Sequence, residues 1–147
     1  MKPATSVRLD HVHVGVSDRR RAAAWYRHVL RLRVTYDYAA HGDPHGPLVL
    51  SGAGNDTQVA LFVDAGAGKR SRGHIGTLAF RVPGADFLSF LRRLTRLELR
   101  SVEGQPVRSS DVVDHGNSYS VYIAAPDRNP LEITTYDHDA VKRAMKG

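Results

Sequence analysis

The sequence predicts an α+β fold made of two similar βαβββ modules, and two observations lead to this prediction. The order of apolar patterns in the first half of the chain is strand, helix and three strands, and it starts again after about 65 residues. Between the halves, residues 64–73 form a linker rich in glycine, lysine and arginine. The 147 residues therefore suit one domain, residues 1–147, with modules at about 8–65 and 74–136.

The first module begins with an alternating strand at residues 8–16. One face of this strand carries His11, His13 and Gly15, and the other face carries Val12, Val14 and Val16. Ser17 or Asp18 can cap the helix that follows. Apolar residues at helical spacing predict that helix: Ala22, Trp25, Tyr26, Val29 and Leu30. Three more strands are expected at residues 33–38, 48–51 and 58–63.

The second module repeats this order. A strand is predicted at residues 75–82, and a helix follows from a second apolar stripe: Phe87, Phe90, Leu91 and Leu94. Three strands should complete the module, at residues 98–103, 118–124 and 131–136. Residues 137–146 are expected to form a short helix or a tail.

The last two predicted strands form a hairpin around the turn Pro-Asp-Arg-Asn-Pro at residues 126–130. Tyr122 lies on its first arm and Glu132 on its second. A glutamate among apolar strand residues lies either on the solvated face or on a buried one, where it needs a cation or a hydrogen-bonding partner. That choice separates a structural hairpin from a metal site.

Several motifs resemble those of the vicinal-oxygen-chelate superfamily, which contains glyoxalases, extradiol ring-cleaving dioxygenases and antibiotic-resistance proteins. Residues 122–132 resemble its pattern Tyr-x-x-x-Pro-Asp-Gly-Asn-x-x-Glu, with Arg128 in place of the glycine. Residues 9–18 are similar to its first strand. Trp25-Tyr26 and Val29-Leu30 resemble its helix motifs, with Arg31 where glycine is usual. The resemblance covers about residues 8–136 and implies cupped mixed sheets around a central cavity.

The resemblance also implies a divalent metal, Fe(II) or Mn(II), with His11 and Glu132 as ligands. Thr77 stands at the family's second histidine position, and Ala60 at the glyoxalase glutamate, so the metal site is altered or empty. His13 shares a face with His11 and could supply a nitrogen instead; otherwise His13 and Thr77 are expected to contact the substrate. His74 is expected to point away from that face. Without a metal, His11 and Glu132 would be a relic pair bonded to each other.

Asp114-His115-Gly116, seven residues before Tyr122, resembles a segment of small catechol-cleaving members. The resemblance implies that His115 is an acid–base catalyst and that the Tyr122 hydroxyl bonds a substrate oxygen. The alternative for His115 is a loop residue in a turn, and the alternative for Tyr122 is a core aromatic residue.

The net charge of +6 comes from 21 basic and 15 acidic residues, with basic runs at residues 19–21, 69–72 and 92–100. Such runs can attract an anion, but they are mostly solvated surface. No aromatic residues interleave with them, so a nucleic acid partner is not expected. No apolar run approaches the ~20 residues of a membrane span. The first residues lack the apolar core of a signal peptide, so a cytoplasmic location is expected. The absence of cysteine excludes thiolate metal sites.

Two functions follow from this reading. The first is a protein of the extradiol-type dioxygenase lineage with an altered metal site, acting on a small oxygen-rich or aromatic molecule. The alternative is a metal-free protein that binds or sequesters such a molecule. An anionic or aromatic ligand fits the positive charge. The resemblance further implies a homodimer.

Overall fold

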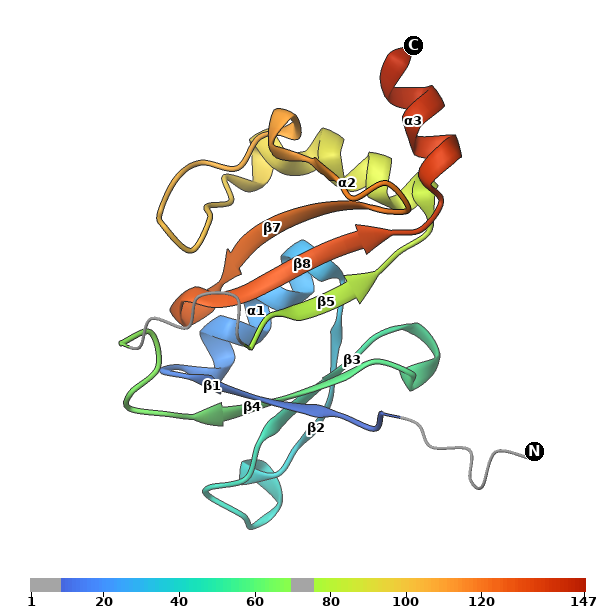
Figure 1. Ribbon diagram of the computed structural model, residues 1–147. Helices are drawn as coiled ribbons and strands as arrows, with labels where there is room; N and C mark the ends of the chain where they lie inside the picture. The colour runs from blue at the N-terminus through green and yellow to red at the C-terminus, as the bar shows by residue number, and fades with distance from the viewer. Residues whose placement is uncertain (1–8, 70–75) are drawn as a thin grey trace, which may run out of the picture. The chain divides into compact units, whose positions relative to one another are not determined.

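The computed structural model describes residues 9–69 and 76–147 of the chain. These form two compact units, and the division between the units falls between Ala67 and Gly68. Each unit has one four-stranded mixed sheet and a helix that follows its first strand (Figure 1). The predicted α+β class with two βαβββ modules is thereby confirmed, while the central cavity and the module limits stay predictions. Ile75, where a strand was expected to begin, and His74, which was expected to point away from the site face, lie outside the described residues.

The first unit contains five elements: β1 (Val12–Val16), α1 (Arg19–Leu30), β2 (Arg33–Asp37), β3 (Leu48–Ser51) and β4 (Gln58–Val63). Its sheet has the order β1-β4-β3-β2, in which β1 and β4 are parallel and the other neighbours antiparallel. The apolar faces of β1 and α1 form its core, with Val16 and Tyr26 almost completely buried.

The ends of α1 follow from local chemistry. The Asp18 carboxylate accepts the Arg21 backbone N–H at 3.0 Å, so Asp18 is the cap that the sequence offered. Arg31 ends the helix in the left-handed conformation with φ 57°, and its N–H bonds the Arg27 carbonyl at 3.1 Å. Arg31 thus adopts a conformation that favours glycine, the residue usual here in the resembling family.

The second unit contains six elements: β5 (Leu78–Arg81), α2 (Gly84–Leu97), β6 (Val113–Asp114), β7 (Tyr119–Ala125), β8 (Asn129–Thr135) and α3 (His138–Lys146). Its sheet has the order β5-β8-β7-β6, with β5 and β8 parallel. The apolar stripe of α2 supplies buried side chains, among them Phe87 and Leu94. Short 3₁₀ turns connect elements in both units: Ala39–His41, Ala53–Asn55, Ser109–Asp111 and Pro126–Arg128.

The strand predicted at residues 98–103 is wrong. Glu98 ends α2 in the left-handed conformation with φ 51°, and the chain then makes a single bridge between Arg100 and Pro106. The segment between them closes on itself as a turn, in which Ser101 N–H bonds the Gln105 carbonyl at 2.8 Å. The fourth strand of the sheet is instead the two-residue β6, which pairs with the start of β7. The tail at residues 137–146 is mostly helix, α3.

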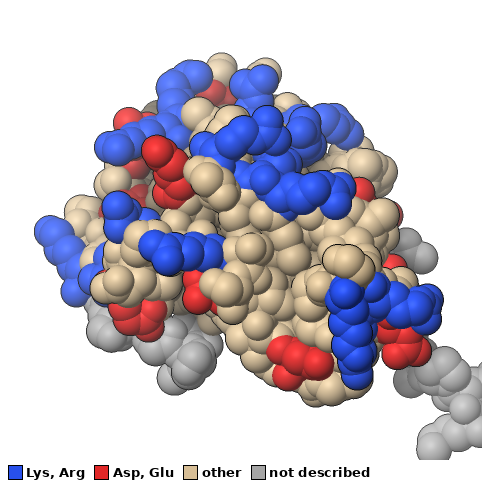
Figure 2. All heavy atoms as spheres, turned by 90° about the horizontal axis from the view of Figure 1, so that it is seen from above, with Lys and Arg blue, Asp and Glu red and all other residues tan. Residues whose placement is uncertain are grey.

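Within the described ranges, no helix has both the length and the apolar character needed to cross a membrane. Figure 2 views the molecule from the side of α2 and α3 and shows more Lys and Arg than Asp and Glu on this surface. Helices α2 and α3 carry several exposed basic residues: Arg92, Arg96, Lys142, Arg143 and Lys146. Of these, Arg92 and Arg96 belong to the basic run at residues 92–100, and both are exposed to solvent.

Candidate functional site

Four polar side chains share one face of the second sheet, the face turned away from its buried apolar residues. Tyr122 lies opposite Glu132 in the β7–β8 ladder, and Ser120 lies opposite Thr134. Side chains alternate along a strand, so the odd-numbered neighbour Val121 points to the other face, where it is completely buried. Strand pairing thus places a phenol, a carboxylate and two hydroxyls side by side.

Glu132 is half-buried and hydrogen-bonded, which answers the question raised by its place among apolar residues. The Ser120 hydroxyl donates to Glu132 Oε1 at 2.6 Å, and the Ser120 oxygen lies 3.0 Å from the Thr134 hydroxyl. Thr134 in turn donates to the Tyr119 carbonyl at 3.2 Å. Ser120 is completely buried, so its short bond to a carboxylate stabilises the charge that Glu132 brings to this face.

His115 meets Tyr122 at the exposed edge of this cluster. Its Nε2 atom lies 3.0 Å from the Tyr122 hydroxyl, and the Tyr122 side chain is 38% exposed. Burial raises the pKa of the Tyr122 phenol, and the negative charge of Glu132 raises it further. The phenol is therefore a proton donor at neutral pH, and the imidazole beside it can accept or return a proton.

A pocket of about 140 Å³ lies against Tyr122 in the same unit. Its lining combines apolar and hydroxyl side chains: Thr77, Ser101, Val102, Ile123, Pro130 and Leu131, together with Glu103 and Tyr122. The Arg128 guanidinium donates to the Val102 carbonyl at 3.2 and 3.0 Å and so holds the turn that forms one side of the pocket. Arg128 adopts φ 58°, a conformation suited to the glycine that the resembling family has here.

His11 and His13 form a separate pair in the first unit. Their Nε2 atoms are 3.0 Å apart, and Asp10 Oδ2 lies 2.6 Å from His11 Nδ1. The His13 ring packs on Phe62 with centroids 4.5 Å apart. The structure therefore brings together His115, Tyr122 and Glu132 among the predicted site residues and places Thr77 beside Tyr122.

The donor set fits a divalent metal only in part. Two imidazole nitrogens 3.0 Å apart can both reach one ion, since metal–nitrogen bonds are about 2.0–2.1 Å. Asp10 would then bond the Nδ1 atom of His11 and fix the orientation of its ring, as carboxylates do for metal-bound histidines. However, in residues 9–69 and 76–147 no three His, Asp or Glu side chains are grouped to hold an ion.

Sequence reasoning missed Ser120 and Thr134. The signal was present, because each lies two residues from a predicted site residue, on the same face of its strand. It also missed His138, whose Nε2 donates to the Asp114 carboxylate at 2.7 Å. No pattern in the sequence connects Asp114 with His138, because a tertiary contact brings them together.

Comparisons with known proteins agree with this architecture. The model of the family described as the Glyoxalase/Bleomycin resistance protein/Dioxygenase superfamily matches residues 8–133. A fosfomycin resistance protein, FosX from Listeria monocytogenes, solved as a point mutant in complex with Mn(II) and 1S,2S-dihydroxypropylphosphonic acid, superposes with a TM-score of 0.69. That match is 14% identical and covers 97% of this chain and 100% of the other.

Two further structures share the fold. Lactoylglutathione lyase from Agrobacterium tumefaciens is 20% identical with a TM-score of 0.62, and the match covers 91% of this chain and 96% of that one. Oxidase ChaP-H2 is 20% identical with a TM-score of 0.64, and the match covers 89% and 94%. The comparison with curated proteins gives no match.

Proposed function

Because the chain belongs to the Glyoxalase/Bleomycin resistance protein/Dioxygenase superfamily, we propose that it is an enzyme acting on a small oxygen-rich or aromatic molecule. Within that superfamily we assign it to the extradiol-type ring-cleaving lineage, with an altered metal site. The observation that carries the proposal is the 3.0 Å contact between His115 Nε2 and the Tyr122 hydroxyl, beside the carboxylate of Glu132.

The pair handles a proton at the oxygen of the bound molecule. Tyr122 stays protonated because its pKa is raised by burial and by Glu132, so its hydroxyl donates to an anionic or carbonyl oxygen of the ligand. His115 then exchanges a proton with that hydroxyl across the same contact. Glu132 opposes the phenolate form, which keeps Tyr122 in its donor state.

The pocket beside Tyr122 supports an aromatic ligand more than an anionic one. Val102, which is half-buried, and the ring of Tyr122 itself offer apolar contacts suited to the faces of an aromatic ligand. Glu103 is the charged residue of the lining, and among the described residues no basic side chain contributes to it. The hydroxyls of Thr77 and Ser101 can bond ring substituents.

A divalent metal, Fe(II) or Mn(II), is part of the proposal. Its support is the resemblance, the Mn(II) in the FosX structure and the convergence of two imidazoles at 3.0 Å. His11 and Glu132 are the proposed ligands, with His13 and Thr77 at the substrate or as replacement ligands. When bound, such an ion polarises the oxygens of its ligand.

A metal-free binding protein is the second candidate. It is favoured by Thr77 at the vacated ligand position and by the lack, in the described part of the chain, of a three-residue metal group. In this reading the pocket and the Tyr122 hydroxyl hold the ligand, and no turnover follows.

The test uses protein purified without a His tag, with 4-nitrocatechol and catechol as probes. We expect 4-nitrocatechol to bind with a change in its visible spectrum, and oxygen to be consumed when Fe(II) and catechol are added. Binding without oxygen uptake after addition of Fe(II) or Mn(II) would overturn the enzyme proposal in favour of the binding protein. Absence of both would contradict the two candidates together.

We also propose a homodimer and a cytoplasmic location. Light scattering should then give about twice the 16.2 kDa of one chain at micromolar concentration. A mass of one chain would refute the dimer.

A further inference from the structure

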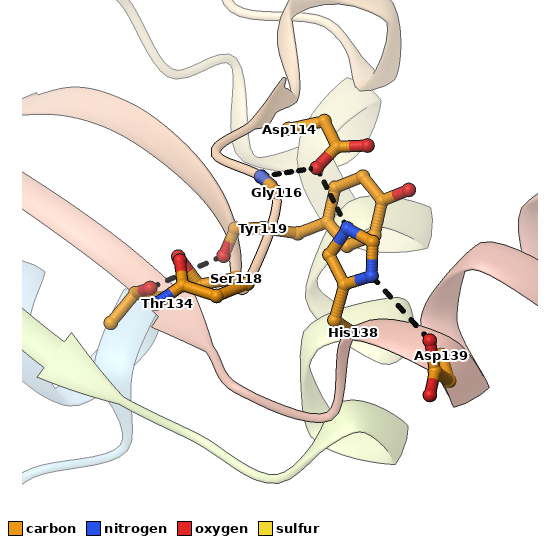
Figure 3. A network of polar contacts seen from close by, with 8 residues as sticks. Asp114, Gly116, Ser118, Tyr119, Thr134, His138 and Asp139 are labelled. Carbon is orange, nitrogen blue, oxygen red and sulfur yellow. Dashed lines mark hydrogen bonds and ion pairs between the residues drawn. The ribbon is translucent and has the colours of Figure 1, made fainter.

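The first residue of the C-terminal helix reaches the loop that carries His115. His138 opens α3, and its Nε2 donates to Asp114 Oδ1 at 2.7 Å (Figure 3). The His138 side chain is only 14% exposed, whereas Asp114 is 46% exposed. The Tyr119 ring stacks on the imidazole with centroids 4.5 Å apart and planes 7° from parallel. Asp139, 3.8 Å from Nδ1 and 90% exposed, is a weaker neighbour.

The same Asp114 oxygen shapes the loop before Tyr119. Oδ1 also accepts the Gly116 N–H at 2.8 Å (Figure 3). This bond closes a turn whose middle residue is His115. The His115 N–H bonds the Ser118 carbonyl at 2.9 Å, and Gly116 adopts φ 87°, so the backbone on both sides of His115 is fixed. One carboxylate oxygen thus connects helix α3 with the turn that presents the His115 imidazole.

Helix α3 is itself held to the rest of the unit. The Asp137 carboxylate accepts the Gly84 N–H at 2.7 Å at the start of α2, and Val141 is completely buried. Because the helix is anchored at its first turn, His138 can act as a fixed donor rather than a mobile one. The hydrogen bond from His138 is the largest cause of the lowered pKa of Asp114, followed by the Gly116 amide.

From this geometry we infer that His138 is a positioning residue for the His115–Tyr122 pair, acting through the Asp114 carboxylate. His138 holds the turn at Asp114–Gly116 and thereby fixes the imidazole of His115 against the Tyr122 hydroxyl. The inference rests on the proposed function only in taking His115 and Tyr122 as the working pair. It concerns the ligand-free protein, so it can be tested apart from any activity.

The test compares two substitutions, and each keeps one of the two contacts of His138. His138→Phe keeps the ring on Tyr119 but loses the donor, whereas His138→Gln keeps an N–H donor of similar reach. In the ligand-free protein, NMR should show the His115 ring resonances shifted in His138→Phe and close to wild type in His138→Gln. The Gly116 amide should exchange with solvent about tenfold faster in His138→Phe, the effect of one lost hydrogen bond. Asp139→Asn is the control and should match wild type.

Wild-type resonances for His115 and Gly116 in a folded His138→Phe protein would overturn the inference. So would a His138→Gln protein that behaves like His138→Phe, because packing of the ring would then be the cause. If His138→Phe does not fold, Asp114→Asn takes its place, since it keeps an oxygen for Gly116 and weakens the contact with His138. Unchanged His115 resonances in Asp114→Asn would overturn the inference equally. Failure of catechol binding or oxygen uptake would instead refute the proposed function.

Discussion

The Nε2 atom of His115 lies 3.0 Å from the hydroxyl of Tyr122, although the loop between β6 and β7 separates the two residues. The alternation of β7 turns Tyr122 to the face that also carries Glu132, and the turn at Asp114–Gly116 brings His115 back to it. A proton acceptor, a proton donor and a carboxylate therefore meet within one unit.

Replacing Glu132 with glutamine should lower the pKa of Tyr122. Burial is the main cause of the raised pKa and remains, but the repulsion between phenolate and carboxylate is removed. The measurement is a ¹³C NMR titration of the Tyr122 ring in metal-free protein. The pKa of Tyr119 is raised by burial and by Asp114, so it serves as the internal control and should not change. An unchanged Tyr122 pKa in Glu132→Gln would show that the carboxylate does not act on the phenol.

Because the pKa of Asp114 is lowered by folding, the free energy of unfolding should fall in acid. Its pKa is lowered from the ordinary value of 3.8 to about 2, chiefly by His138 and then by the Gly116 amide. The folded protein therefore binds fewer protons than the unfolded chain between about pH 4 and pH 2, and stability is lost as pH falls through that window. Urea denaturation should show a smaller loss over the same window in Asp114→Asn. In Asp139→Asn the loss should equal that of wild type, and equal losses in all three proteins would contradict the assignment.

Gly84→Ala should destabilise the second unit by about 1–3 kcal/mol, the usual cost of overpacking. A Cβ at this position would lie 2.9 Å from Asp137 Cβ and 3.2 Å from Val141 Cγ2, so α3 would have to move. Alanine is otherwise the better helix former, so a loss of stability would have to come from the contact with α3. Urea denaturation measures it, with Ala85→Ser on the exposed side of α2 as a control near zero. A more stable Gly84→Ala protein would show that the contact between α2 and α3 is loose.

Metal binding should depend on His11 and Glu132, and Thr77→His should raise it by orders of magnitude. Thr77 stands two residues before Ala79, which pairs with Glu132, so alternation places residues 77 and 132 on the same face. A histidine there would add the imidazole that the resembling family has. Calorimetric titration of Mn(II) measures the change, with His45→Ala, an exposed histidine of the first unit, as the control. No gain in Thr77→His together with no binding in wild type would favour the metal-free candidate.

Most of the fold could be predicted because apolar alternation and helical spacing are local signals. The prediction of a strand at residues 98–103 was wrong because Glu98 ends α2 in the left-handed conformation and the chain then closes a local turn between Ser101 and Gln105. In the site, Tyr122 and Glu132 could be predicted because the hairpin resembles a motif of the superfamily, and His115 because Asp114-His115-Gly116 resembles a segment of its catechol-cleaving members. His138 could not be predicted, because its contact with Asp114 depends on how α3 packs against α2.

The dissociation constant of 4-nitrocatechol for wild type and Tyr122→Phe tests the central claim most directly. The phenol should donate to an oxygen of the bound ring, and loss of a hydrogen bond to a charged group costs about 1.5–3 kcal/mol. We therefore expect binding to Tyr122→Phe to be roughly 10- to 100-fold weaker than to wild type, at the same Mn(II) concentration. Tyr136→Phe, which changes an exposed tyrosine that lies against Arg81, should bind as wild type does. Equal affinity of Tyr122→Phe and wild type would contradict the account.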